Sequence, residues 1–417
     1  MTAEERPVDW VLNEHARSIT HSAAVAELFP PGTFHLARAF HCQLPGYRIS
    51  PLKNLPRLAA MAGLGGIWVK DESARLSLSS FKVLGGSFAI YRHLASRLGA
   101  DGRQLAFGEL TAEAVRPQLG EVTFAAATDG NHGRGVAWSA TQLGFRSVIY
   151  VHKLTSQARI DAIAKNGARV VVVDGTYDDA VRQVNEDAGR HGWQVISDTS
   201  WEGYTDIPLW VMQGYTTMLS EAQEQLAAQG IIRPTHVLVQ AGVGSLAAAT
   251  IGYYAEVFGS DRPRTMVVEP TKAACLFASA EAGDGQPHNF AGDLDTIMAG
   301  LACGEPNPLA WRILWDCADV FARCPDYVAA KGMRVYGVPL AGDPFIVSGE
   351  SGAVTLGALL FTLQRPECAS LREFLGLGSD SQVLLINSEG NTDPDEFRRV
   401  VWEGGDPVPD RYQQFRR

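Results

Sequence analysis

The pattern of hydrophobic positions predicts a chain in which strands and helices alternate. Short runs rich in β-branched residues recur along most of the length, and longer segments with helical periodicity separate them. The predicted strands cover residues 67–70, 122–127, 147–152, 169–173, 194–197, 236–240, 265–269 and 383–387. The predicted helices cover residues 131–143, 156–166, 177–189, 208–228, 244–257 and 351–364. This alternation is typical of crossover units around a parallel sheet, so we expect an α/β fold. Residues 260–350 are rich in Gly and Pro, and we expect them to be the least regular part.

Length and charge narrow the classes of function. A chain of 417 residues predicts two or three domains. Its 46 acidic residues outnumber its 36 basic residues, and the resulting net charge of −10 disfavours a nucleic-acid partner. The charged N-terminus lacks the apolar core of a secretory signal, and no apolar run reaches the roughly 18 residues needed to span a bilayer. We therefore expect a cytoplasmic protein that does not bind membranes.

Several common catalytic motifs are absent. The six cysteines form no CxxC pair, which predicts reduced core thiols and no metal site. None of the seven lysines follows a glycine, so there is no phosphate loop of the GxxxxGK[ST] type, and no HExxH helix is present. The sequence around Ser351 resembles a nucleophile elbow, but Ala353 replaces its final glycine. The turn at 242–244 lacks the third glycine of a dinucleotide-binding loop.

Lys82 stands at the centre of the first of three turns that could bind a ligand. Its neighbours Phe81, Val83 and Leu84 are apolar, and no carboxylate lies nearby in the sequence. Burial in such surroundings favours the neutral amine, which can form a Schiff base with an aldehyde. The alternative interpretation is a lysine at the start of a helix with its stem on the surface.

The second turn consists of Gly242, Val243, Gly244 and Ser245, between an apolar run and an alanine-rich helix. Its glycines let backbone N–H groups converge, and the helix N-terminus favours negative charge. The turn is therefore a candidate phosphate cradle. It could equally be a tight connection that only allows close packing.

The third turn places Thr128, Asp129, Gly130, Asn131 and His132 directly after the run VTFAAA. Asn131 could bond a ring hydroxyl, and Asp129 could face a substrate; either could instead cap a helix. Together the three turns offer an amine, a phosphate cradle and a polar partner for a ring. Pyridoxal 5'-phosphate requires these three groups, so we expect it as the cofactor.

At these residues the chain resembles the fold type II pyridoxal-phosphate enzymes, which include tryptophan synthase β and threonine dehydratase. Within that superfamily it is most similar to the diaminopropionate ammonia-lyases. The likeness lies in seven ordered blocks: FKVLGGSFAIYR (81–92), TDGNHGRGVAW (128–138), DTSWEGYTDIPLWVMQGY (198–215), QAGVGSLAAA (240–249), TIMAGLACGEPNP (296–308), SGESGAVTLG (348–357) and SEGNTDP (388–394).

The resemblance implies an architecture. It comprises two open, twisted, mostly parallel sheets flanked by helices, with the cofactor between two domains. The large domain would comprise residues 1–84 and 205–417, and the small domain residues 85–204. The family also implies a homodimer.

The resemblance also implies a reaction and residue roles. Lys82 would carry the cofactor as an aldimine, and 2,3-diaminopropionate would lose ammonia through aminoacrylate to give pyruvate. Asp129 and Asp198 would assist as catalytic or substrate-binding groups, and Ser79 and Thr128 would contact the substrate. The phosphate would bind Gly242, Val243, Gly244 and Ser245, the ring oxygen Asn131, and the pyridine nitrogen Ser388.

The negative charge of Asp129 favours a diamino acid as the substrate. Threonine and serine dehydratases, which this chain resembles, typically carry a serine where this chain has Asp129. A carboxylate there would repel a simple amino-acid carboxylate and attract a second ammonium group. Two alternatives stay open: a serine or threonine dehydratase or other β-replacing enzyme of the same fold, and a non-catalytic protein that only binds the cofactor.

Overall fold

The computed structural model describes residues 6–100, 104–128 and 130–413, and these form two compact units. Unit 1 contains Met1–Glu27, Ser50–Ser73 and Glu221–Arg417, and unit 2 contains Leu28–Ile49 and Ala74–Ser220. The sequence placed the smaller domain at 85–204. Unit 2 is larger because helices on either side of that range pack with it.

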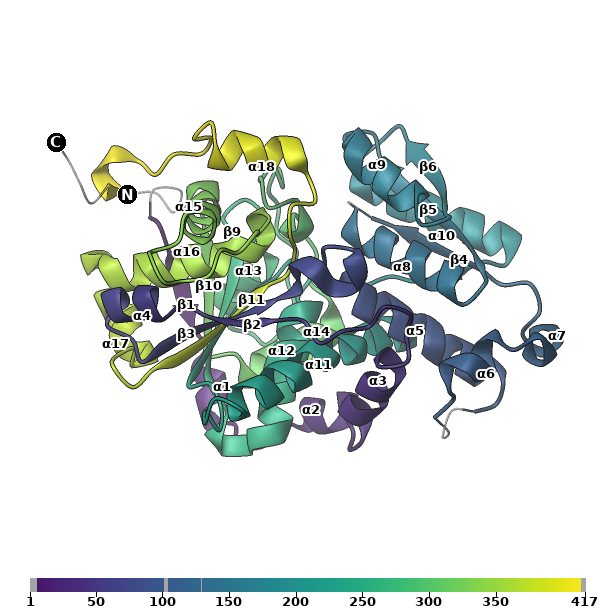
Figure 1. Cartoon of the computed structure of the whole chain (residues 1–417), viewed down its shortest axis with the longest axis horizontal. Helices are drawn as coiled ribbons and strands as arrows, with labels where there is room; N and C mark the ends of the chain where they lie inside the picture. The colour runs from purple at the N-terminus through teal and green to yellow at the C-terminus, as the bar shows by residue number, and fades with distance from the viewer. Residues whose placement is uncertain (1–5, 101–103, 129, 414–417) are drawn as a thin grey trace. The chain divides into compact units, whose positions relative to one another are not determined.

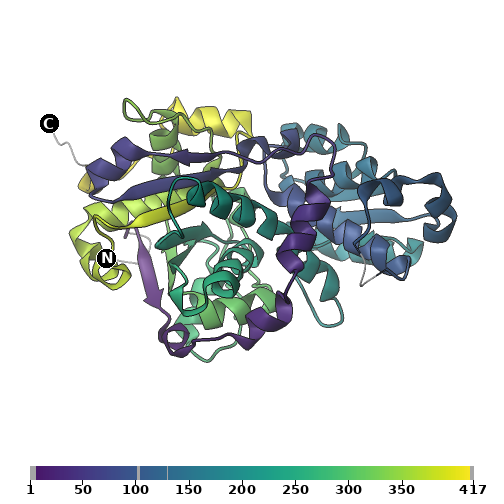
Figure 2. The same ribbon diagram turned by 60° about the horizontal axis from the view of Figure 1, so that its bottom comes forward.

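Unit 1 is built on a seven-stranded sheet in the order β1-β10-β9-β8-β11-β3-β2. Its strands are β1 (Asp9–Leu12), β2 (Leu52–Asn54), β3 (Gly66–Asp71), β8 (His236–Gln240), β9 (Arg264–Pro270), β10 (Val320–Cys324) and β11 (Gln382–Asn387). The five central strands run parallel, whereas β1 and β2 pair antiparallel at the two edges (Figures 1 and 2). The prediction of a mostly parallel sheet is confirmed for this unit.

Helices cover the sheet of unit 1 and bury its strands. They are α1 (Glu14–Ser18), α2 (Ala23–Leu28), α4 (Pro56–Ala62), α12 (Ser245–Phe258), α13 (Cys275–Ala282), α14 (Pro308–Cys317), α15 (Asp326–Gly337), α16 (Glu350–Gln364), α17 (Ala369–Leu375) and α18 (Pro394–Val401). Alternate strand residues such as Ile67 and Val69 or Val383 and Leu385 share one core with α4, α15 and α16. Their neighbours in the sequence are also buried, because the sheet is covered on both faces, as parallel sheets require.

Unit 2 contains a four-stranded parallel sheet in the order β6-β5-β4-β7. The strands are β4 (Thr123–Ala127), β5 (Arg146–His152), β6 (Arg169–Val173) and β7 (Gln194–Val195). Its helices are α3 (Thr33–His41), α5 (Lys82–Arg97), α6 (Phe107–Thr111), α7 (Arg116–Leu119), α8 (Asn131–Gln142), α9 (Gln157–Ala164), α10 (Tyr177–His191) and most of α11 (Asp206–Ala227). Helix α10 packs on the face of Val148 and Tyr150, and α8 packs on the face of Ile149, so both faces are covered.

The expectation of irregular structure in residues 260–350 holds in part: β9, α13, α14, β10 and α15 fall within them, whereas the stretches 283–307 and 338–349 contain no strand or α-helix. Two other expectations need correction. Strand β7 is two residues long and not four. Cys42 is exposed, so the prediction of core thiols fails there, while Cys275, Cys317, Cys324 and Cys368 are buried.

No described helix is long and apolar enough to cross a membrane. Within the same residues, no group of three or more His, Cys, Asp and Glu side chains is arranged to hold a metal ion.

Candidate active site

Lys82 is the first residue of α5, and a strained turn in unit 2 leads into it. Leu76, Ser77 and Ser79 all adopt left-handed backbone conformations, with φ of 49°, 60° and 54°. Such conformations cost free energy for residues other than glycine and tend to persist at functional sites. Ser79, which the sequence predicted to contact the substrate, is therefore part of the turn that positions Lys82.

A carboxylate pairs with Lys82, contrary to the apolar surroundings that the sequence suggested. Lys82 Nζ lies 2.9 Å from Asp198 Oδ2, and the two side chains are 16% and 14% exposed. Burial alone would raise the pKa of Asp198, but the charges of Lys82 and His132 outweigh it and hold that pKa well below its usual range. Asp198 is thus ionised at neutral pH and faces an amine.

Tyr204 fixes the short segment that carries Asp198. Its hydroxyl donates to Val195 O at 2.8 Å and accepts from Ser197 N–H at 3.0 Å. Trp201 stacks on Tyr204 with ring centroids 4.1 Å apart. The block DTSWEGY therefore folds back on the end of β7 and holds Asp198 in place.

The turn at 128–132 is held mainly by Thr128. Its hydroxyl accepts hydrogen bonds from the N–H groups of Gly130, at 2.9 Å, and Gly133, at 3.1 Å. Gly130 is the N-cap of α8 and Asn131 is its first residue, so Asn131 does not serve as the cap. Asp129, the other candidate cap, lies outside the described residues.

His132 is a site residue for which the sequence assigned no role. It is 2% exposed, and its Nε2 donates to Ile196 O at 2.8 Å, which ties the start of α8 to the segment before Asp198. Its Nδ1 is buried and has no partner among the described residues. The sequence GNH directly after a predicted strand could have drawn attention to His132. Only the fold shows that its imidazole bonds the carbonyl of Ile196.

Close packing explains the last glycine of TDGNHGRG. A Cβ on Gly135 would lie 2.9 Å from Val83 Cα and 3.0 Å from Val83 N. These are backbone atoms directly after Lys82, so they cannot move without shifting the lysine. Gly135 therefore lets α8 touch the start of α5.

Tyr215 on α11 is a second residue that the sequence did not single out. It packs against Phe81 with ring centroids 4.7 Å apart and is 1% exposed. Burial raises the pKa of Tyr215, and the nearby Asp198 charge raises it further. Its buried hydroxyl has no hydrogen-bond partner among the residues described.

In unit 1, the turn at 242–245 forms the start of α12. Gly244 is the N-cap with φ of 101°, a conformation that favours glycine, and a Cβ on Gly242 would lie 3.0 Å from Cys303 Sγ. The first N–H groups of a helix have no acceptor within it, and they attract anions. Asn307, which the sequence analysis missed, supports the turn by donating to Val243 O at 2.7 Å and to Ser245 Oγ at 2.9 Å.

Ser388 follows β11 and is oriented by Gln240 at the end of β8. Gln240 Nε2 donates to Ser388 Oγ at 2.7 Å, and Ser388 is 3% exposed. Because the oxygen accepts from the amide, the hydroxyl proton can be donated to another acceptor. Gln240 was not predicted, since its position in a buried strand gave no sign of a polar role.

Comparisons with known proteins agree on one family. The family model for "Pyridoxal-phosphate dependent enzyme" matches residues 44–387. The diaminopropionate ammonia-lyase of Escherichia coli strain K12 is 50% identical over 378 residues, covering 90% of this chain and 93% of that protein. The diaminopropionate ammonia-lyase of Salmonella typhimurium strain LT2 is 44% identical over 384 residues, covering 92% of this chain and 95% of that protein.

Solved structures give the same picture. The E. coli diaminopropionate ammonia-lyase in complex with D-serine matches with a TM-score of 0.88 at 47% identity, covering 96% of this chain and 98% of that one. The same enzyme with an aminoacrylate-PLP azomethine reaction intermediate matches with a TM-score of 0.86, at the same identity and coverage. Threonine deaminase isoform 2 from Solanum lycopersicum, 20% identical with a TM-score of 0.72, shares the fold and covers 96% of this chain and 98% of its own.

Proposed function

The chain belongs to the pyridoxal-phosphate-dependent enzyme family, and we propose that it catalyses the α,β-elimination of 2,3-diaminopropionate to pyruvate and ammonia. The observation that carries this proposal is the 50% identity to the E. coli diaminopropionate ammonia-lyase over 90% of this chain. Elimination releases the β-amine as ammonia. Hydrolysis of the remaining enamine consumes water and releases the α-amine, so each pyruvate is accompanied by two ammonia molecules.

The residues of each unit fit the cofactor that the family uses. Pyridoxal phosphate, when bound, withdraws the electron pair left on the α-carbon. Lys82 would bond its aldehyde, and the glycine turn at 242–245 offers N–H groups for its phosphate with no side chain on Gly242 or Gly244. The hydroxyl of Ser388, oriented by Gln240, would donate to the ring nitrogen. We assign the ring oxygen to Asn131, the first residue of α8.

Lys82 would also move a proton. When it is not bonded to the cofactor, its neutral amine would accept the α-proton of the substrate. Asp198, 2.9 Å away, would stabilise the resulting ammonium group. The left-handed turn at Leu76, Ser77 and Ser79 fixes the position of the backbone that leads into Lys82.

Asp198 supplies a reason for preferring a diamino acid. Its pKa lies well below the usual range, so it is negative at neutral pH. The β-ammonium of the substrate would bind the same carboxylate as Lys82, through a charge-assisted hydrogen bond of the same kind. Serine and threonine carry a neutral hydroxyl on the β-carbon in place of the β-ammonium, so they would not form this ion pair.

Asp129 would act from the opposite face of the substrate. We propose that it removes the α-proton from the second stereoisomer and protonates the departing β-amine. We also propose that two copies of the chain form a dimer, as the family resemblance implies, and light scattering of the purified protein tests this.

The assay that tests the function compares four substrates. Purified holoenzyme is given L- or D-2,3-diaminopropionate, L-serine or L-threonine, and both pyruvate or 2-oxobutyrate and ammonia are measured. We expect diaminopropionate to be the best substrate, with two ammonia molecules for each pyruvate. Equal or faster turnover of serine or threonine, with one ammonia for each keto acid, would make the protein a dehydratase instead.

A further inference from the structure

A cavity lies in unit 1, and none of the cofactor-binding residues assigned above lines it. Its volume is about 400 Å³, which is within the usual range for small-molecule sites. Its walls come from α4, from the second half of α15 and the segment after it, from the end of α16, and from the chain after α18. Apolar side chains predominate, among them Leu55, Leu58, Val335, Leu360, Phe361 and Val408.

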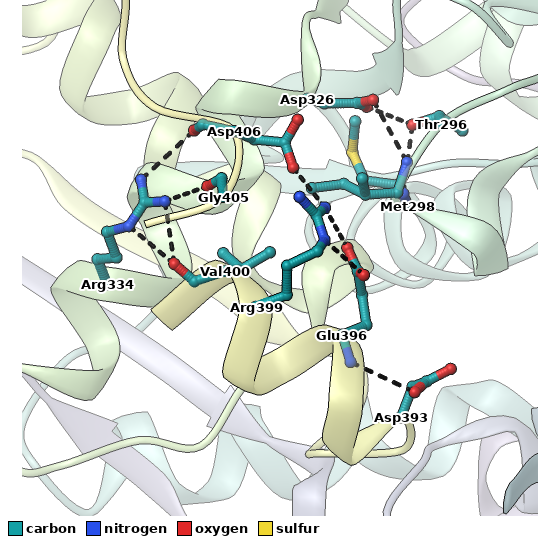
Figure 3. A network of polar contacts seen from close by, with 11 residues as sticks. Thr296, Met298, Asp326, Arg334, Asp393, Glu396, Arg399, Val400, Gly405 and Asp406 are labelled. Carbon is teal, nitrogen blue, oxygen red and sulfur yellow. Dashed lines mark hydrogen bonds and ion pairs between the residues drawn. The ribbon is translucent and has the colours of Figure 1, made fainter. Parts of the chain in front are cut away.

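The C-terminal wall of this cavity is held firmly. Arg334 on α15 donates to Val400 O at 3.0 Å and also to Gly405 O, and Arg399 pairs with Asp406 at 2.6 Å (Figure 3). Further along, Arg365, the C-cap of α16, donates to Tyr412 O. The segment that carries Val408 and Tyr412 is thus bonded to both helices, so the cavity is preformed.

The polar groups in the cavity wall favour an anion. Lys331 is half-buried and has no acceptor among the described residues, and its charged neighbours are Arg334 and Arg365. Burial lowers the pKa of Lys331, and these two guanidinium groups lower it further. The carboxylate of Asp343 is already engaged by the N–H groups of Arg57, at 2.8 Å, and Leu58, at 2.9 Å.

Arg365 adds a second unsatisfied donor. Its Nε is buried and unpartnered in the part of the chain that the structure describes, while its guanidinium lies over the rings of Phe361 and Tyr412 at 5.5 and 5.4 Å. A buried donor without an acceptor is costly unless a ligand or water satisfies it. The rim is apolar and accessible, since Met61, Val338 and Leu340 are 58%, 75% and 41% exposed.

We propose that this cavity binds a small organic anion, with its carboxylate paired to Lys331 and Arg365 and its aliphatic or aromatic body among Leu58, Leu360 and Phe361. Charge complementarity selects the anion, because cations line the wall and the carboxylate of Asp343 is occupied. The apolar walls favour a ligand whose remaining part is aliphatic or aromatic. The ligand of this cavity differs from the amino-acid substrate of the proposed reaction. That substrate carries two ammonium groups, which the cations in the cavity wall would repel.

Titration of the holoenzyme with octanoate tests the proposal. By calorimetry we expect one octanoate for each chain and much weaker binding of 1-octanol, which has the same body without the charge. Lys331→Met should reduce the affinity for octanoate by about tenfold or more, the usual effect of losing a charged hydrogen bond. Lys165→Met, at an exposed lysine of unit 2, is the matched control and should leave the affinity unchanged.

A second variant guards against indirect effects. Val335→Trp should fill the cavity and abolish octanoate binding while Lys331 remains, and thermal unfolding checks that both variants fold. Absence of octanoate binding to the wild type, or equal affinity in Lys331→Met, would overturn the proposal. It would also be overturned if Leu340→Glu split a dimer of the holoenzyme, because the rim would then be an interface between copies.

Discussion

Lys82 and Asp198 form an ion pair of 2.9 Å although 116 residues separate them in the chain. The lysine begins α5, and the aspartate follows β7, where Tyr204 bonds the backbone of Ser197 directly before it. This relationship joins a nucleophilic amine to an ionised acceptor within one unit. It gives the proposed ammonia-lyase both a proton carrier and a site for a second ammonium group.

Removing the charge of Asp198 should weaken recognition of the diamino acid. For Asp198→Asn we expect kcat/KM for 2,3-diaminopropionate to fall roughly 10- to 100-fold, the range for a lost charge-assisted hydrogen bond, with a smaller effect on serine. Bound cofactor, measured by visible absorbance, should be retained. Asp174→Asn is a matched control, because Asp174 is exposed and pairs with Lys153 at 3.1 Å. An equal loss for serine and diaminopropionate would contradict the role of Asp198 in recognising the β-ammonium.

Asp129→Asn tests the role proposed for Asp129 on the opposite face of the substrate. We expect turnover of the D-isomer to fall at least about 100-fold, the usual contribution of a general base, while cofactor colour and some L-isomer turnover remain. Separate assays of the two isomers give the comparison. Undiminished D-isomer activity would remove Asp129 from the proposed mechanism.

Gly135→Ala should disturb the packing beneath Lys82. The added Cβ would meet the Val83 backbone at 2.9 Å, so we expect a loss of about 1–3 kcal/mol in the free energy of unfolding and reduced cofactor content. Gly189→Ala lies within α10, where a Cβ meets nothing within 4 Å among the described residues. That control should stabilise the protein by about 0.5–1 kcal/mol. Equal stability of the two variants would show that the α5–α8 contact tolerates a side chain.

Glu269 should make stability depend on pH. Burial raises its pKa to about 8, although the N–H groups of Leu276 and Phe277, at 2.9 and 2.7 Å, donate to it. Near pH 6 the folded protein therefore holds a proton that the unfolded chain has released. The stabilisation is fully present below the ordinary glutamate pKa of roughly 4.5 and is lost as pH rises to about 8.

Unfolding of the wild type and of Glu269→Gln between pH 5 and 9 measures this dependence. Relative to the variant, the wild type should lose on the order of 1.4 kcal/mol per pH unit between pH 5 and about 8, and nothing further above that. Parallel curves for the two proteins across this range would show that Glu269 does not retain a proton on folding.

The sequence predicted the central strands well because their β-branched runs are buried on both faces. Strands β6 and β8 have the predicted bounds, Arg169–Val173 and His236–Gln240, and the fold class, cofactor and family are confirmed. The edge strands β1 and β2 were missed because they are short and half-exposed. Strand β10 was missed because Arg323 interrupts its apolar run.

The site was only partly visible in the sequence. Motifs pointed to Lys82 and the glycine turn as candidates, and the family resemblance pointed to Ser388. The partners Asp198 for Lys82, Gln240 for Ser388 and Asn307 for Ser245 depend on contacts between distant segments. No local pattern encodes such a pairing. For the same reason the sequence suggested apolar surroundings for Lys82 where the fold supplies a carboxylate.

The central claim, that Lys82 is covalently joined to pyridoxal phosphate, is tested most directly by borohydride reduction of the holoenzyme followed by peptide mapping. Reduction fixes the bond as a stable secondary amine, and mass spectrometry locates it. We predict a single modified peptide, the one that contains Lys82, and no modification or visible absorbance in Lys82→Ala. Modification at another lysine, or none in a protein that still converts 2,3-diaminopropionate, would contradict the account.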